Sequence, residues 1–107
     1  MGALITLQYN TKTVTDQEAE TLAHAIQQTV KDVLSQNDVF VYANKSIVAL
    51  ADPIEIFIQV NKDETSDPAG LTEAIATRLS EWKQTAGFTL PVNINVHPVE
   101  WHYKIGI

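Results

Sequence analysis

The chain has 107 residues, 7 of them Lys or Arg and 13 Asp or Glu, and it contains no cysteine. A hydrophobic fraction of 45% and a charged fraction of 19% are typical of a soluble globular chain, so the composition excludes wholesale disorder. A net charge of −6 disfavours nucleic-acid binding, which requires clustered Lys and Arg. Without cysteine the chain has no disulfide scaffold, no thiolate metal site and no Cys nucleophile.

The length and the hydropathy pattern predict a soluble protein. No apolar segment reaches the ~18 residues that cross a bilayer, and the N-terminus lacks the layout of a signal peptide. We therefore expect a cytoplasmic protein with neither nucleic acid nor membrane as a partner. The whole chain, 1–107, is predicted to be one domain, with repeat halves of about 1–53 and 54–107.

The first half predicts a strand, a helix and a second strand. Apolar residues alternate from Ala3 to Tyr9, which is the period of a half-buried strand. Thr15-Asp16-Gln17-Glu18 is a capping box, and it opens an amphipathic helix that ends near Ser35 with Asn37 as its stop signal. Alternation returns from Val39 to Ala43, and a connection with a short apolar run, Ile47 to Ala51, follows.

The second half repeats this order. Ile54 to Val60 is the most regular alternating segment. Asp67 and Pro68 are a good N-cap and first helical residue, and Gly87 suits the left-handed position that ends a helix. Leu90 to His97 alternates again, and the tail from Pro98 to Ile107 has room for a turn or a short edge strand.

The equivalent positions of the two halves are offset by 51 or 52 residues. This spacing predicts a tandem βαβ repeat of the α+β (α/β) class. Because such crossovers are right-handed, both helices should lie on one face of a four-stranded mixed sheet.

The other face of that sheet should carry a mixture of polar and apolar side chains. Its predicted members are Leu4, Thr6, Gln8, Phe40, Tyr42, Glu55, Phe57, Gln59, Pro91, Asn93, Asn95 and His97. Aromatic residues bury about 150–250 Å² each, so several together approach the size of an interface patch. We favour self-association through this face over a solvated face with scattered apolar residues.

Several short motifs, and the order in which they occur along the chain, resemble the tautomerase superfamily, which includes 4-oxalocrotonate tautomerase and macrophage migration inhibitory factor. Ala3 to Leu7 is similar to the opening strand of that family, and Thr15 to Glu18 is similar to its helix start. Pro53 to Val60 and Tyr103 to Gly106 resemble an uncharacterised bacterial branch, the DUF1904 type. The resemblance implies a tautomerase/MIF-like fold and a homo-oligomer, commonly a trimer.

The resemblance also implies where a site would lie. Catalysis in that superfamily uses an N-terminal proline as base, but here Gly2 and Ala3 follow Met1, and Pro53 is the first proline. The Gly2 amine substitutes for it only if Met1 is removed, so we assign no catalytic residue.

The binding residues that we expect are Ala3, Lys12, Phe40, Tyr42, Asn95 and His97. Ala3 takes the place of the proline, and Asn95 matches an asparagine that faces a neighbouring subunit's pocket. Lys12 and Lys45 are candidates for binding a small carboxylate. The single arginine, Arg78, should lie on a solvated helix face, and His24 on a helix surface.

We expect neither a metal nor a cofactor. His97, Glu100 and His102 are close in sequence, but their spacing matches no rigid ligand pair. Three functions remain open on the sequence: a keto–enol tautomerase acting on a small oxo acid, a non-enzymatic trimeric binding or structural relative, and a ferredoxin-like ligand-binding or regulatory domain. The ferredoxin-like domain has the same element order but threads its strands 4-1-3-2 instead of 2-1-3-4.

Overall fold

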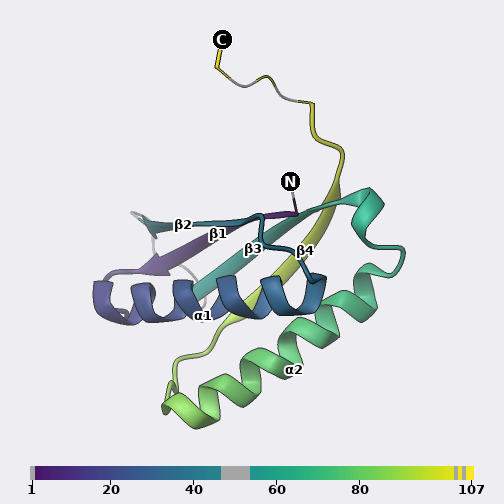
Figure 1. Cartoon of the computed structure of the whole chain (residues 1–107). Coiled ribbons are helices and arrows are strands. Elements are labelled where there is room, and N and C mark those ends of the chain that lie inside the picture. The colour runs from purple at the N-terminus through teal and green to yellow at the C-terminus, as the bar shows by residue number, and fades with distance from the viewer. Residues whose placement is uncertain (1, 47–53, 103, 105) are drawn as a thin grey trace.

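In residues 2–46, 54–102, 104, 106 and 107, which a computed structural model of the chain describes, four strands form one sheet and two helices cover one of its faces (Figure 1). The elements are β1 (Ala3–Asn10), α1 (Asp16–Leu34), β2 (Val39–Ser46), β3 (Ile54–Asn61), the short 3-10 helix η1 (Lys62–Glu64), α2 (Pro68–Ala86) and β4 (Asn93–Val99). This is the predicted β-α-β-β-α-β order. Only η1 is an addition that the sequence pattern did not indicate.

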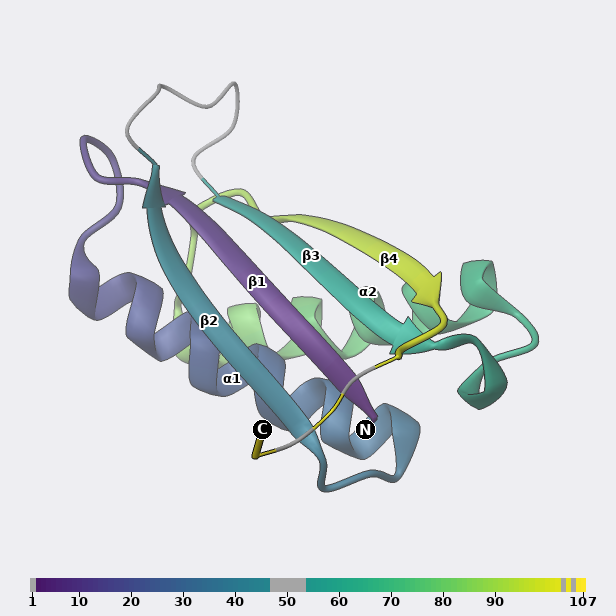
Figure 2. The same cartoon turned by 90° about the horizontal axis from the view of Figure 1, so that it is seen from above.

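The strands lie side by side in the order β2-β1-β3-β4. β1 runs parallel to β2 and antiparallel to β3, and β3 runs parallel to β4, so the sheet is mixed. Figure 2 looks onto the face without helices, where the same order is visible. The order confirms the tandem repeat and excludes the ferredoxin-like threading.

Both helices begin where the capping signals predicted. The Thr15 hydroxyl accepts from the Glu18 backbone at 3.1 Å, and the Glu18 carboxylate accepts from the Thr15 backbone at 2.9 Å. Asp67 accepts from the backbone of Gly70 at 3.0 Å, one turn into α2. At the other end of α2, Gly87 has the left-handed φ of 68° that the sequence predicted for it.

α1 ends near Ser35, as predicted, and Ser35 itself, not Asn37, adopts the left-handed conformation (φ 54°) that ends the helix. Two strand boundaries differ from the prediction by three residues. β2 continues to Ser46, past the predicted Ala43. The last strand begins at Asn93 and not at Leu90, because the carbonyl of Leu90 accepts a hydrogen bond from Lys83 at 2.7 Å and Pro91 has no N–H to donate. Pro91 therefore does not belong to the sheet. The apolar run predicted at 47–51 lies outside the described residues.

The core lies between the sheet and the helices. β1 and β3 point alternate side chains toward the helices, and their Ile, Leu and Val residues there are fully buried. Each such side chain contributes roughly 1.5–3 kcal/mol relative to an exposed one. The core members with the largest side chains are Ile5, Leu7, Leu22, Ile26, Ile54, Ile56, Ile58 and Ile75. No helix among the described residues is long and apolar enough to cross a membrane.

Candidate functional site

The strand register arranges the uncovered face of the sheet in three rows. From the β2 edge to the β4 edge, these rows are Phe40–Leu4–Gln59–His97, Tyr42–Thr6–Phe57–Asn95 and Asn44–Gln8–Glu55–Asn93. All twelve side chains belong to alternate positions of their strands, so they share one face. Eleven of the twelve residues predicted for this face are present, and Asn44 replaces Pro91 in the set.

Aromatic side chains are exposed on this face. Phe40 is 46% exposed, Tyr42 60% and Phe57 37%. The ring of His97 stacks on that of Phe57, with centroids 6.3 Å apart and planes 25° from parallel. The face therefore exposes three aromatic rings among its polar side chains.

Within one chain, the predicted binding residues of this face lie at opposite edges. Phe40 and Tyr42 are on β2, whereas Asn95 and His97 are on β4, with two strands between them. Three strand spacings separate these edges by about 14 Å. A small ligand therefore does not contact both pairs within one chain.

A carboxylate at one end of the face is held by two asparagines. The side-chain amide of Asn93 donates to Glu55 Oε1 at 2.9 Å, and that of Asn95 donates to Glu55 Oε2 at 3.3 Å. The same side-chain amide of Asn95 also donates to the backbone carbonyl of Ile56 at 3.2 Å. The amide of Asn95 is thus engaged within its own chain.

The start of β1 is closely packed. The backbone nitrogens of Gly2 and Ala3 both donate to the carbonyl of Asp38, at 3.0 and 3.1 Å. A Cβ at Gly2 would lie 3.0 Å from that same oxygen and 3.1 Å from Cβ of Gln36, so only glycine fits without movement of its neighbours. The Ala3 side chain is fully buried on the helix side of the sheet.

Lys12 lies at the far end of β1 from Ala3. It is exposed in the turn that leads into α1, and its backbone nitrogen donates to Asn10 Oδ1 at 3.0 Å. An eight-residue strand such as β1 is about 25 Å long, so Lys12 and Ala3 do not share a site in one chain.

A cluster that the sequence analysis did not predict lies at the same end of β1 as Lys12. The phenol of Tyr9 donates to Asp16 Oδ1 at 2.9 Å, and Lys45 lies 3.2 Å from Asp16 Oδ2. The hydrogen bond from Tyr9 is the main cause that lowers the pKa of Asp16, and the contact with Lys45 adds to it. Burial is the main cause that raises the pKa of Tyr9. Lys45 thus pairs with a carboxylate of its own chain, which competes with a carboxylate ligand.

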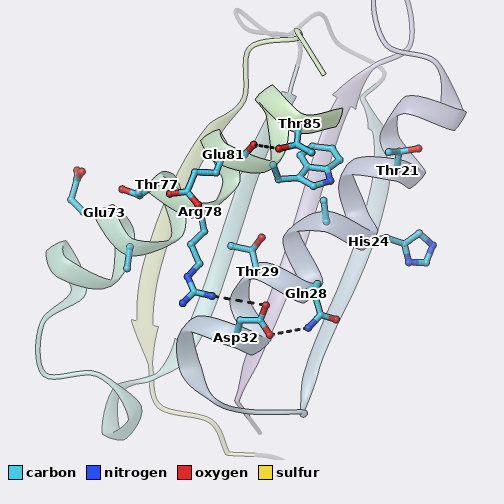
Figure 3. A pocket seen from close by; sticks show the side chains of 13 residues that line it. Thr21, His24, Gln28, Thr29, Asp32, Glu73, Thr77, Arg78, Glu81 and Thr85 are labelled. Atoms are coloured by element: carbon cyan, nitrogen blue, oxygen red, sulfur yellow. Dashed lines mark hydrogen bonds and ion pairs between the residues drawn. The ribbon is translucent and has the colours of Figure 1, made fainter. Parts of the chain in front are cut away.

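A groove of about 1090 Å³ lies between α1 and α2 (Figure 3). His24 and Arg78, both predicted to lie on solvated helix surfaces, are exposed and line it. Arg78 lies 4.0 Å from Asp32, and Gln28 donates to Asp32 at 2.9 Å. In the sequence, this groove corresponds to a second row of residues on each helix, next to the apolar row that packs into the core.

The amino-acid sequence matches no known family profile and no curated protein. Solved structures do match the fold over nearly the whole chain. FG41 malonate semialdehyde decarboxylase inhibited by 3-bromopropiolate has a TM-score of 0.67 and 15% identity, over 97% of this chain and 89% of that one.

Two further structures show the same likeness. A DUF1904 protein of Sebaldella termitidis has a TM-score of 0.65 and 11% identity, over 98% of this chain and 97% of that one. A macrophage migration inhibitory factor-like protein of Entamoeba histolytica has a TM-score of 0.56 and 18% identity, over 95% of this chain and 93% of that one. Together with the strand order, these matches establish that the chain has the tautomerase/MIF-like fold.

Proposed function

We propose that this protein is a homotrimeric binding or structural protein that assembles through the uncovered face of its sheet and does not use the amine chemistry of the tautomerases. The observation that carries the proposal is the aromatic surface formed by Phe40, Tyr42 and Phe57. Exposed aromatic residues on adjacent rows of one face are typical of an interface that is covered in the working molecule.

The position of the predicted binding residues supports a ring of copies. In a cyclic assembly each copy presents one edge to the next, so the β2 edge of one chain meets the β4 edge of its neighbour. That arrangement would bring Phe40 and Tyr42 next to Asn95 and His97, which lie far apart in a single chain. A small carboxylate at this boundary is the ligand that we propose, with the His97 ring as a donor.

The start of β1 argues against amine catalysis. Position 2 is a glycine, so removal of Met1 would leave a primary amine and not the secondary amine of a proline. The nitrogen of Gly2 also donates to the carbonyl of Asp38 at 3.0 Å, and an acceptor at that distance favours the protonated form of an amine. A protonated amine is not a general base.

The interface is tested by placing a charge in the middle row of the face. Phe57→Glu should lower the solution mass toward the 11.9 kDa of one chain, because a buried carboxylate without a partner disfavours assembly. Thr89→Glu adds the same charge at an exposed loop position outside the sheet and should leave the mass unchanged. Equal masses for the two variants would contradict the interface.

The second candidate is a keto–enol tautomerase acting on a small oxo acid through the Gly2 amine. The burial of Gly2 at the head of β1 favours it, because burial disfavours the charged form of an amine. Ketonisation of an enol acid should be compared between protein that begins at Gly2 and protein that keeps Met1. We expect no difference, and a faster rate with the free Gly2 amine would support the enzyme instead.

A further inference from the structure

The groove between α1 and α2 lies in the helix layer, so it is independent of the sheet face on which the proposed assembly rests. Figure 3 shows it from the helix side, with the strands behind. It is open to solvent and is not an enclosed cavity. Small-molecule sites bury most of their ligand, whereas an open groove between two helices suits an elongated partner.

Each helix presents a stripe of the same spacing to the groove. On α1 the stripe is Thr21, Ala25, Gln28 and Asp32, and on α2 it is Ala74, Arg78, Glu81 and Thr85. Both follow steps of four, three and four residues, which keep side chains on one side of a helix. The first and last residues of each stripe are eleven residues apart, which is about 16 Å along a helix, so the groove matches roughly three turns of a third helix.

The charges of the groove are unbalanced. Arg78 and Asp32 lie 4.0 Å apart and offset one another. Glu73 and Glu81 also line the groove, two turns apart on α2, and the described lining residues offer them no second Lys or Arg. The remaining negative charge favours a basic occupant.

We propose that this groove binds a basic amphipathic helix of a partner protein. The apolar stripe of that helix would lie over Ala25 and Ala74, where short side chains allow close approach, and against the half-buried Trp82. Its Lys or Arg residues would lie beside Glu73 and Glu81.

The test uses a peptide of about 15 residues with Leu at helical i, i+3 and i+4 positions and Lys elsewhere, a length at which helices become marginally stable. A second peptide carries Glu in place of Lys. Because the chain has Trp82 and Trp101, the Trp101→Phe variant leaves Trp82 as the single indole reporter in the groove. The emission of Trp82 and titration calorimetry at physiological salt then report binding.

The Leu/Lys peptide should bind, and the Leu/Glu peptide should not. Ala74→Arg fills the groove and adds a positive charge, so it should weaken binding about tenfold or more. Gln84→Arg adds the same charge on α2 outside this groove and should change affinity less than about twofold.

A second pair of variants isolates the acidic residues. Glu73→Gln with Glu81→Gln should weaken binding about three- to tenfold, whereas Asp63→Asn with Glu64→Gln removes two equal charges outside the groove and should have little effect. The proposal is overturned if neither peptide binds, if the acidic peptide binds as well, or if the members of each variant pair behave alike.

Discussion

Tyr9 and Asp16 are joined by a hydrogen bond of 2.9 Å, from a phenol at the end of β1 to a carboxylate in the first turn of α1. Lys45, at the end of β2, lies 3.2 Å from the other carboxylate oxygen. The contact ties the first crossover helix to both strands of its βαβ unit. It therefore links the stability of the fold to the ionisation of Asp16.

We predict that Tyr9→Phe makes stability less dependent on acid pH. The hydrogen bond from Tyr9 is the main reason that the pKa of Asp16 lies below its ordinary value of 3.8. A lowered pKa contributes stability above the ordinary value, and that stability is lost as the pH falls through the folded-state pKa. Urea unfolding at pH 7 and pH 3 should show a smaller difference for Tyr9→Phe than for the wild type. Tyr42→Phe, at a 60% exposed tyrosine, is the control and should retain the wild-type difference.

Asn95→Asp should destabilise the chain at neutral pH. The new carboxylate would lie where an amide now donates to Glu55 Oε2 at 3.3 Å, so a favourable hydrogen bond would become a like-charge contact. We expect a loss of about 1 kcal/mol more than for Asn95→Ala at pH 7, since the site is partly solvated. The difference in stability between the two variants should disappear near pH 3, where carboxylates are protonated. A difference that persists there would show that charge is not the cause.

Thr15→Ala should lower the free energy of unfolding by about 1 kcal/mol, because the N-cap hydroxyl accepts from the Glu18 backbone at 3.1 Å. Thr13→Ala, two residues earlier in the exposed turn, should change it by less than about 0.5 kcal/mol. Chemical denaturation of both variants measures the difference. Similar losses would mean that the cap is not what holds the start of α1.

Gly87 should accept Asn better than Ala. Its φ of 68° is left-handed, and a Cβ there would meet no atom within 4 Å, so the cost of a substitution comes from backbone conformation and not from crowding. We expect Gly87→Ala to cost about 1 kcal/mol and Gly87→Asn less. Thermal unfolding of the two variants checks the order, and the reverse order would indicate a packing effect.

The elements were predictable because their signals are local. The capping residues Thr15 and Asp67, the left-handed Gly87 and the alternation in each strand act over a few residues. The equal spacing of the two halves then made the tandem topology, and hence the shared face of Phe40, Tyr42 and Asn95, accessible from the sequence.

The features that the sequence did not indicate depend on contacts between distant residues. The start of β4 moved because Lys83 reaches the carbonyl of Leu90, and Lys45 meets Asp16 only once β2 lies beside β1. The groove depends on how far apart α1 and α2 settle on the sheet, which the pattern of either helix alone does not specify.

The solution mass of the wild-type protein tests the central claim most directly, because the uncovered sheet face is proposed to hold copies together. Sedimentation equilibrium at neutral pH, over a range of micromolar concentrations, gives that mass without reference to shape. We predict three times the 11.9 kDa of one chain. A mass of 11.9 kDa at every concentration would contradict the proposal, since the aromatic face would then be stable in water by itself.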